Sequence, residues 1–211
     1  MHEKSIKYYD LLAKKINDPT EIRNKSEDSS ALDFSYLIEM IPEKSIILDL
    51  GSGTGLLVNK LCNAGFYVHA VERCKEFANF IQINKKIIIH IADLRVFEPE
   101  RSFNYVTAFG VLNFFTVEEA FILYKKIFSW ILPGGRLILK HQMGVIDDVL
   151  IDGFSKELNT DYFSMYRAVD HELELLSRAG FKIDQVDDIY GNRINRWANT
   201  RFFAVVATRP S

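Results

Sequence analysis

Five short apolar runs dominate the central part of the chain, and a segment long enough for a helix separates each run from the next. The runs are Ile46–Leu50, Tyr67–Val71, Ile87–Ile91, Tyr105–Phe109 and Arg136–Lys140. Nearly continuous apolar runs that are rich in β-branched residues are typical of parallel strands buried on both faces. The pattern therefore predicts an α/β protein with a doubly wound, mostly parallel sheet and crossover helices.

The connecting segments carry apolar residues at helical spacing. Leu56–Ala64 and Val117–Leu132 place such residues three or four positions apart, as helices that pack on a sheet do. A later helix is predicted over His171–Ala179, and two late strands follow at about Phe181–Ile189 and Phe202–Thr208. These strands bring the predicted sheet to seven.

The regular alternation does not extend over the whole chain. A weak helical pattern covers Ile6–Ile16, a polar stretch follows, and a second helix is predicted over Asp33–Ile41. Residues 1–44 are therefore predicted to form an N-terminal helical cap, and residues 45–211 the core. Residues from about 142 to 170 are richer in aromatic and acidic side chains, which predicts an insertion in that core.

Composition indicates an ordinary globular protein. Of the 211 residues 48% are hydrophobic, and 26 basic residues against 28 acidic ones give a net charge of −2. This balance provides no overall attraction to nucleic acid or to an anionic membrane, so neither is expected as a partner. The two cysteines, Cys62 and Cys74, fall in predicted helices and indicate neither a disulfide framework nor a metal site. Without a signal peptide or a long apolar stretch, the chain is expected to be cytoplasmic.

A glycine-rich loop follows the first predicted strand and carries the clearest chemical signal. It runs Asp49-Leu50-Gly51-Ser52-Gly53-Thr54-Gly55, and three alternate positions without a Cβ let backbone amides approach a ligand closely. A dinucleotide fingerprint starting at Gly51 needs a glycine where Leu56 stands, and the lysine of a phosphate-binding loop is missing. Neither NAD nor ATP is favoured, although a plain strand-to-helix turn would also use such glycines.

This loop resembles motif I of the class I, Rossmann-like S-adenosylmethionine-dependent methyltransferases, in particular the small-molecule type. Leu132-Pro133-Gly134-Gly135 resembles the turn before the fifth strand of that family, and Ala179-Gly180 resembles its helix end before the sixth. The resemblance spans roughly Ile46 to Thr208 and implies a seven-stranded sheet with helices on both faces and an antiparallel last strand. It also implies S-adenosylmethionine as the cofactor.

Several cofactor-binding residues follow from the strand ends and from the resemblance. Glu72, next to Arg73, ends the second strand, where an acid can accept hydrogen bonds from both ribose hydroxyls. In the resembled family, the positions of Asp93 and Leu94 border the adenine, and those of Phe109, Gly110 and Val111 lie near the sulfonium. Asn104 departs from the aspartate that is common there at the start of the fourth strand. The full expected set is Asp49, Gly51, Ser52, Gly53, Thr54, Gly55, Glu72, Arg73, Asp93, Leu94, Phe109, Gly110 and Val111.

Catalytic and acceptor residues are less firmly indicated. His141, just beyond the fifth strand, is the best-placed candidate base, with His171 and Tyr9 or Tyr8 as others, although core packing explains each of them too. Asn113, Tyr166, Arg196 and Trp197 are the candidate acceptor contacts, and the insertion is expected to cover the acceptor. Arg23 and Lys25 are candidates for neutralising the methionine carboxylate, and solvation is the simpler explanation of both charges.

The favoured function is methyl transfer from S-adenosylmethionine to an oxygen or nitrogen of a small metabolite or sugar (EC 2.1.1.-). The expected partner is a small-molecule acceptor, and a homodimer is possible. Three alternatives stay open: a non-catalytic adenosylmethionine-binding protein, an RNA or protein methyltransferase, and a nicotinamide oxidoreductase.

Overall fold

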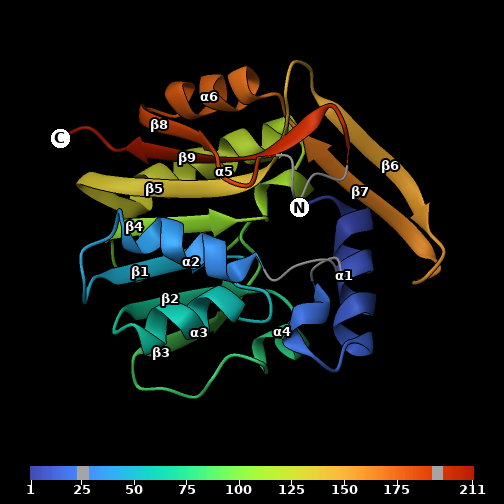
Figure 1. Ribbon diagram of the computed structural model, residues 1–211, viewed down its shortest axis with the longest axis horizontal. Helices are drawn as coiled ribbons and strands as arrows, with labels where there is room; N and C mark the ends of the chain where they lie inside the picture. The colour runs from blue at the N-terminus through green and yellow to red at the C-terminus, as the bar shows by residue number, and fades with distance from the viewer. Residues whose placement is uncertain (23–28, 192–196) are drawn as a thin grey trace.

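A seven-stranded sheet forms the centre of the computed structural model, which describes residues 1–22, 29–191 and 197–211 (Figure 1). Its strand order is β3-β2-β1-β4-β5-β9-β8. Strands β1 to β5 run parallel to one another, whereas β9 is antiparallel to both of its neighbours, β5 and β8. The strands are β1 (Ile46–Leu50), β2 (Tyr67–Glu72), β3 (Ile87–Ile91), β4 (Phe103–Phe109), β5 (Ile131–Gly144), β8 (Lys182–Asp188) and β9 (Thr200–Thr208).

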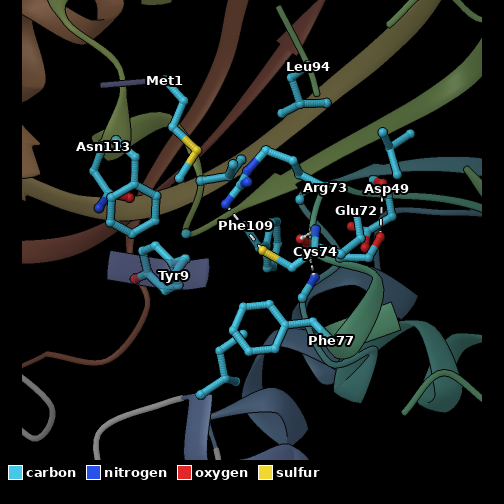
Figure 2. Close-up of a pocket in the computed structure, with 18 of the residues that line it drawn as sticks. Met1, Tyr9, Asp49, Glu72, Arg73, Cys74, Phe77, Leu94, Phe109 and Asn113 are labelled. Carbon is cyan, nitrogen blue, oxygen red and sulfur yellow. Dashed lines mark hydrogen bonds between the residues drawn. The ribbon is translucent and has the colours of Figure 1, made fainter. Parts of the chain in front are cut away.

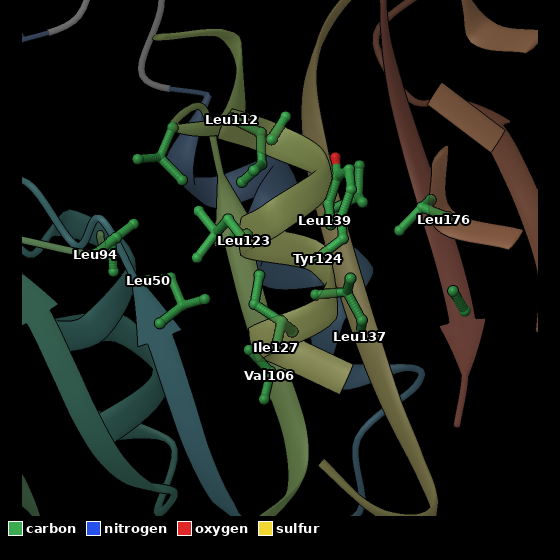
Figure 3. Packing of buried hydrophobic residues seen from close by; sticks show 14 of the residues in the cluster. Leu50, Leu94, Val106, Leu112, Leu123, Tyr124, Ile127, Leu137, Leu139 and Leu176 are labelled. Carbon is green, nitrogen blue, oxygen red and sulfur yellow. The ribbon is translucent and has the colours of Figure 1, made fainter. Parts of the chain in front are cut away.

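Helices cover both faces of this sheet, because its central strands expose apolar side chains in both directions. On one face, α2 (Ser30–Ile38) and α3 (Leu56–Asn63) contribute to a buried cluster with the β1 side chain Ile47. On the other, α5 (Val117–Trp130) and α6 (Val169–Arg178) pack over β4 and β5. Figure 3 shows Leu123 and Ile127 of α5 against the sheet. The core thus lies in two layers around one sheet.

The N-terminus of α5 is fixed by the residues at its start. The Thr116 hydroxyl accepts a hydrogen bond from the Glu119 backbone amide, and the Glu119 carboxylate accepts one from the Thr116 amide. This reciprocal capping box satisfies two backbone donors that the first turn of a helix leaves unpaired. It fixes where the segment after β4 turns into the helix.

A separate two-stranded sheet and the first helix lie together beside the carboxyl ends of the parallel strands (Figure 1). The hairpin consists of β6 (Val149–Ser155) and β7 (Thr160–Tyr166), and the helix is α1 (Glu3–Lys15). The Ser5 hydroxyl on α1 donates to the Phe163 carbonyl of β7 at 2.7 Å, and Lys4 forms an ion pair with Asp152 of β6. Short elements complete the chain: η1 (Pro19–Ile22), α4 (Lys75–Ala78) and η2 (Leu112–Phe114).

The predicted fold class is confirmed, including the antiparallel last strand. Several boundaries differ from the sequence-based expectation. Strand β5 extends over Ile131–Gly144 instead of Arg136–Lys140, and the predicted irregular insertion contains the β6–β7 hairpin. Cys74 precedes α4 rather than lying in a helix. Tertiary pairing explains the longer strand, because β9 supplies backbone partners as far as Gly144.

Candidate functional site

A cavity of about 790 Å³ lies at the carboxyl ends of strands β1 to β5. Open parallel sheets bind ligands at this edge, at the point where the strand order reverses. The loops that follow the two neighbouring strands run there to opposite faces of the sheet and leave a crevice between them. Figure 2 shows Asp49 and Glu72 on one side of the cavity and Tyr9 and Asn113 on the other. The cavity is therefore bounded by the sheet edge and, across from it, by α1.

The glycine loop forms the floor of the cavity with a backbone that only glycine adopts easily. Gly51, Gly53 and Gly55 have φ values of +70°, +55° and +74°. A Cβ on Gly51 would lie 2.6 Å from Cγ2 of Val111, which also lines the cavity. Thus the loop and the segment after β4 meet so closely that no side chain fits between them.

Glu72 is the carboxylate that joins this loop to the second strand. Its Oε2 accepts a hydrogen bond from the Gly53 amide at 2.8 Å, and its Oε1 accepts one from the Cys74 amide at 2.7 Å. Burial raises the pKa of Glu72 above its ordinary value, although these two amide donors oppose the shift. A buried acceptor with two oxygens therefore lies against the glycine loop, inside the cavity.

Asp49 and Asp93 add two further carboxylates at neighbouring strand ends. Asp49 is buried, and its Oδ1 accepts a hydrogen bond from the Thr107 hydroxyl of β4 at 2.6 Å. Burial alone would raise the pKa of Asp93, but hydrogen bonds from Arg95 outweigh it and hold that pKa below its ordinary value. Asp93 is therefore ionised at neutral pH.

Aromatic and amide side chains line the cavity opposite the glycine loop. Tyr9 of α1 packs edge-on against Phe114, with ring centroids 4.8 Å apart, and Tyr162 of β7 also lines this part. Asn113 donates from Nδ2 to the Ser164 hydroxyl of β7 at 2.8 Å. Burial raises the pKa of Tyr9 well above its ordinary value, so its phenol stays protonated at neutral pH.

A fully buried arginine supports the segment that carries Asn113. The Arg167 guanidinium donates to the carbonyls of Leu112 and Phe115 at 3.0 and 3.1 Å and forms an ion pair with Glu172 of α6. The Tyr124 hydroxyl donates to the same carboxylate. Arg167 thereby ties η2, α5 and α6 together behind the cavity.

The structure brings most of the predicted site residues together. The cavity is lined by Tyr9, Asp49, Gly51, Ser52, Gly53, Thr54, Glu72, Arg73, Asp93, Leu94, Phe109, Gly110, Val111, Asn113 and Tyr166. Gly55, His141, His171 and Trp197 are not among the described lining residues. Arg23, Lys25 and Arg196 lie outside the described residues.

The two candidate histidines lie elsewhere in the fold. His141 is completely buried, with Nε2 3.5 Å from the Glu172 carboxylate, and burial holds its pKa well below its ordinary value. His171 contacts Asp148 at 2.8 Å near the base of the hairpin. This placement gives no support to a base role for either histidine, because a base must reach the proton that it removes.

Sequence reasoning missed Lys140 and Gln142, which both line the cavity. Lys140 is almost fully buried and pairs with Asp33 of α2, with Nζ 3.0 Å from Oδ2. A lysine at the end of an otherwise apolar strand was the available signal, since lysine is almost never buried without a partner. Tyr162 was recognised only as one of several aromatic residues in the insertion.

The described residues contain neither a metal-binding group of side chains nor a membrane-spanning helix. Within 1–22, 29–191 and 197–211, the histidine, cysteine, aspartate and glutamate side chains form no group of three or more arranged to hold a metal ion. No helix in that part of the chain has the length and apolarity to cross a lipid bilayer.

Comparison with known proteins agrees with the fold. Residues 47–135 match a family described as a methyltransferase domain. The chain is 24% identical over 148 residues to a phosphoethanolamine N-methyltransferase of Plasmodium falciparum, covering 66% of this chain and 54% of that protein. It is 31% identical over 105 residues to a carboxy-S-adenosyl-L-methionine synthase of Vibrio parahaemolyticus, covering 50% and 40%. The chain thus spans about half or less of these relatives.

Solved structures extend the likeness over nearly the whole chain. A 1,6-didemethyltoxoflavin-N1-methyltransferase of Burkholderia thailandensis superposes with a TM-score of 0.74 at 16% identity, covering 98% of this chain and 90% of that one. The glycopeptide N-methyltransferase MtfA, complexed with S-adenosyl-L-homocysteine, gives 0.72 at 14% identity, covering 96% and 98%.

The sheet with its antiparallel last strand, together with the cavity at its carboxyl edge, defines the Rossmann-like methyltransferase class of proteins. The domain match at residues 47–135 adds a sequence relationship to this structural class. Residues 47–135 therefore carry a methyltransferase domain, and the chain as a whole has the fold of class I S-adenosylmethionine-dependent methyltransferases.

Proposed function

We propose that this chain transfers a methyl group from S-adenosylmethionine to a nitrogen or oxygen of a small molecule. The observation that carries the proposal is the buried Glu72 carboxylate, which lies against the Gly53 amide inside a cavity of about 790 Å³. A two-oxygen acceptor at the end of the second strand suits the paired hydroxyls of a ribose. The adjacent glycine backbone leaves room for a ligand at close range.

The residues of the cavity fit the proposed cofactor. Glu72 would accept from the ribose hydroxyls, and Asp93 would accept from the exocyclic amine of the adenine. Leu94 and Val111 supply apolar surface nearby, and the backbone of Gly51 and Gly53 lines the part of the cavity proposed for the methionine portion. When bound, S-adenosylmethionine supplies a methyl group activated on a sulfonium.

At the acceptor end of the cavity, the side chains act by orienting the acceptor molecule. Tyr9, Phe114 and Tyr162 offer ring faces and edges to a flat molecule, while Asn113 and Gln142 offer amide groups that hold it by hydrogen bonds. The protonated Tyr9 phenol can donate a hydrogen bond but cannot remove a proton at neutral pH. Holding the acceptor in line with the methyl group supplies much of the rate in such a displacement.

The α1 helix and the β6–β7 hairpin form the proposed acceptor cover. Their contacts, such as the Ser5 hydrogen bond to the Phe163 carbonyl and the edge-on packing of Tyr8 against Tyr162, close one side of the cavity. Such a cover keeps water from the sulfonium and strengthens the polar contacts inside the site.

Calorimetric titration with S-adenosylhomocysteine and with NADH tests the cofactor. We expect binding of the former and none of the latter; binding of NADH alone would contradict the proposal. Glu72→Gln should weaken S-adenosylhomocysteine binding about tenfold or more, because charge-assisted hydrogen bonds are lost. Glu76→Gln, the same change at an exposed position of α4, is the matched control and should leave affinity unaltered.

Turnover is tested with S-adenosylmethionine carrying a labelled methyl group. The protein is incubated with pools of small amines, phenols and hydroxylated metabolites, and label is sought in products other than the cofactor. Label in an acceptor that disappears with Glu72→Gln supports catalysis. Tight cofactor binding without transfer to any pool would favour the alternative of a non-catalytic adenosylmethionine-binding protein.

A further inference from the structure

A buried ion pair lies at the acceptor end of the cavity, on the side away from the three carboxylates. Lys140 of β5 donates from Nζ to Asp33 Oδ2 at 3.0 Å and to the Tyr190 hydroxyl at 2.9 Å. Tyr190 in turn donates to the other oxygen of Asp33. Asp33 is completely buried and Lys140 is 5% exposed, so the lysine charge is balanced within the fold.

Of Lys140, Asp33 and Tyr190, only the lysine reaches the cavity. Lys140 lines it, whereas Asp33 and Tyr190 lie behind the wall. The rings of Phe109 and Phe202, which also line the cavity, lie beside the ammonium with centroids 5.2 and 5.7 Å from Nζ. Ring faces attract a cation and hold it in place. The positive end of the pair is therefore the end presented to a ligand.

The carboxylates and the lysine lie at opposite ends of the cavity, because they come from different strands of the sheet. Asp49 and Glu72 lie at the ends of β1 and β2, and Asp93 follows β3, whereas Lys140 lies on β5, beyond β4. The other cationic side chain in the described lining is Arg73, whose guanidinium pairs with Asp10 of α1 at 2.7 Å. The end near β1 to β3 thus suits hydrogen-bond donors and a cationic cofactor, and the β5 end suits an acceptor of negative charge.

We propose that Lys140 forms an acceptor subsite that binds an oxyanion, either a carboxylate or a phosphate, on a flat acceptor molecule. Aromatic rings at Phe109 and Phe202 would contact the body of the molecule while its anionic group meets the ammonium. This substrate class rests on the proposed function, because it assigns the acceptor half of the same cavity. Lys140 is a specificity-determining residue in this arrangement, and Asp33 and Tyr190 position it.

Matched small probes test the subsite without knowledge of the natural acceptor. Protein saturated with S-adenosylhomocysteine is titrated calorimetrically with benzoate, with neutral isosteric benzamide and with phenyl phosphate. Benzoate should bind about tenfold tighter than benzamide, the difference between a charge-assisted and a neutral hydrogen bond. Comparison of benzoate with phenyl phosphate tells which oxyanion the subsite prefers.

The variant Asp33→Asn/Lys140→Met removes both charges together, so that no unpaired charge is left buried. In this variant the benzoate-to-benzamide ratio should fall to about one. Lys182→Met/Asp184→Asn, which removes a surface pair with Lys182 74% exposed, should keep the wild-type ratio. Thermal unfolding checks that both variants fold.

The outcomes separate this inference from the proposed function. If S-adenosylhomocysteine fails to bind the wild-type protein, the proposed function fails. If it binds but benzoate is not preferred, or neither probe binds at millimolar concentration, the subsite is overturned. The wild-type comparison decides this even if the double variant does not fold. A preference that persists in a folded double variant places the anion elsewhere and also refutes the assignment.

Discussion

Gly51 is the position where adding a single methyl group should perturb the site most clearly. Its φ of +70° lies in the left-handed region, and an added Cβ would lie 2.6 Å from Cγ2 and 2.7 Å from Cβ of Val111. Because Cβ of Val111 is fixed to the backbone, rotation of the valine side chain cannot relieve the overlap. Gly51→Ala therefore forces the glycine loop and the segment after β4 apart.

Two contributions determine how far Gly51→Ala lowers the free energy of unfolding. A left-handed conformation costs an alanine about 1–2 kcal/mol, and inserting a methyl group into a closely packed contact costs about 1–3 kcal/mol. Together they lower the free energy of unfolding by about 2–5 kcal/mol. For a domain of this size that corresponds to a decrease in Tm of roughly 4–20 °C. S-adenosylhomocysteine affinity should fall as well, because both residues line the cavity.

Thermal unfolding and calorimetric titration measure these two effects. Gly191→Ala is the matched control: its φ is +55° and no atom of the described residues lies within 4 Å of its added Cβ, so it isolates the backbone contribution. Gly51→Ala should melt well below Gly191→Ala. Equal Tm values, or wild-type affinity for S-adenosylhomocysteine in Gly51→Ala, would show that the contact with Val111 does not constrain the loop.

Three further outcomes can be measured directly. Burial raises the pKa of Glu72, and its ionised form is the better hydrogen-bond acceptor, so S-adenosylhomocysteine affinity should decline as pH falls through that raised pKa. Glu72→Gln should not show this decline. If both proteins show it, another group is responsible for the pH dependence. Arg167→Met should lower the free energy of unfolding by about 3–5 kcal/mol, because it removes the partner of the buried Glu172 carboxyl and the donor to the Leu112 and Phe115 carbonyls. Its control Arg178→Met, at a side chain 57% exposed, should stay within about 0.5 kcal/mol, and a similar small loss at Arg167 in urea denaturation would contradict the ion-pair argument. Alkylation of Cys74 by iodoacetamide should be slow at pH 8 in the folded protein and fast in urea, because burial raises the pKa of its thiol to about 12; rapid modification of the folded protein would contradict this burial.

The cofactor half of the candidate site could be predicted because each of its parts lies at, or just after, the end of a predicted strand. The glycine loop follows β1, Glu72 ends β2 and Asp93 follows β3, and parallel strands bring their carboxyl ends to the same edge. The cavity contains these residues.

The acceptor half was harder to predict, because it depends on which way neighbouring side chains point. His141 and Lys140 are consecutive residues of β5, so their side chains lie on opposite faces of the sheet. His141 faces Glu172 beneath α6, whereas Lys140 faces Asp33 of α2 and the cavity. Sequence alone placed both at a strand end but could not tell which face borders the cavity.

The succession of the seven sheet strands along the chain and the position of the glycine loop follow from the sequence, since hydrophobic periodicity and the placement of glycines are local properties. The partners of distant residues, in contrast, depend on the folded chain: the hairpin lies against α1, Arg167 beneath η2 and Lys140 beside Asp33. Such contacts join residues up to 158 positions apart. They form where the fold brings buried charges and polar groups together, because each such group must find a partner once water is excluded.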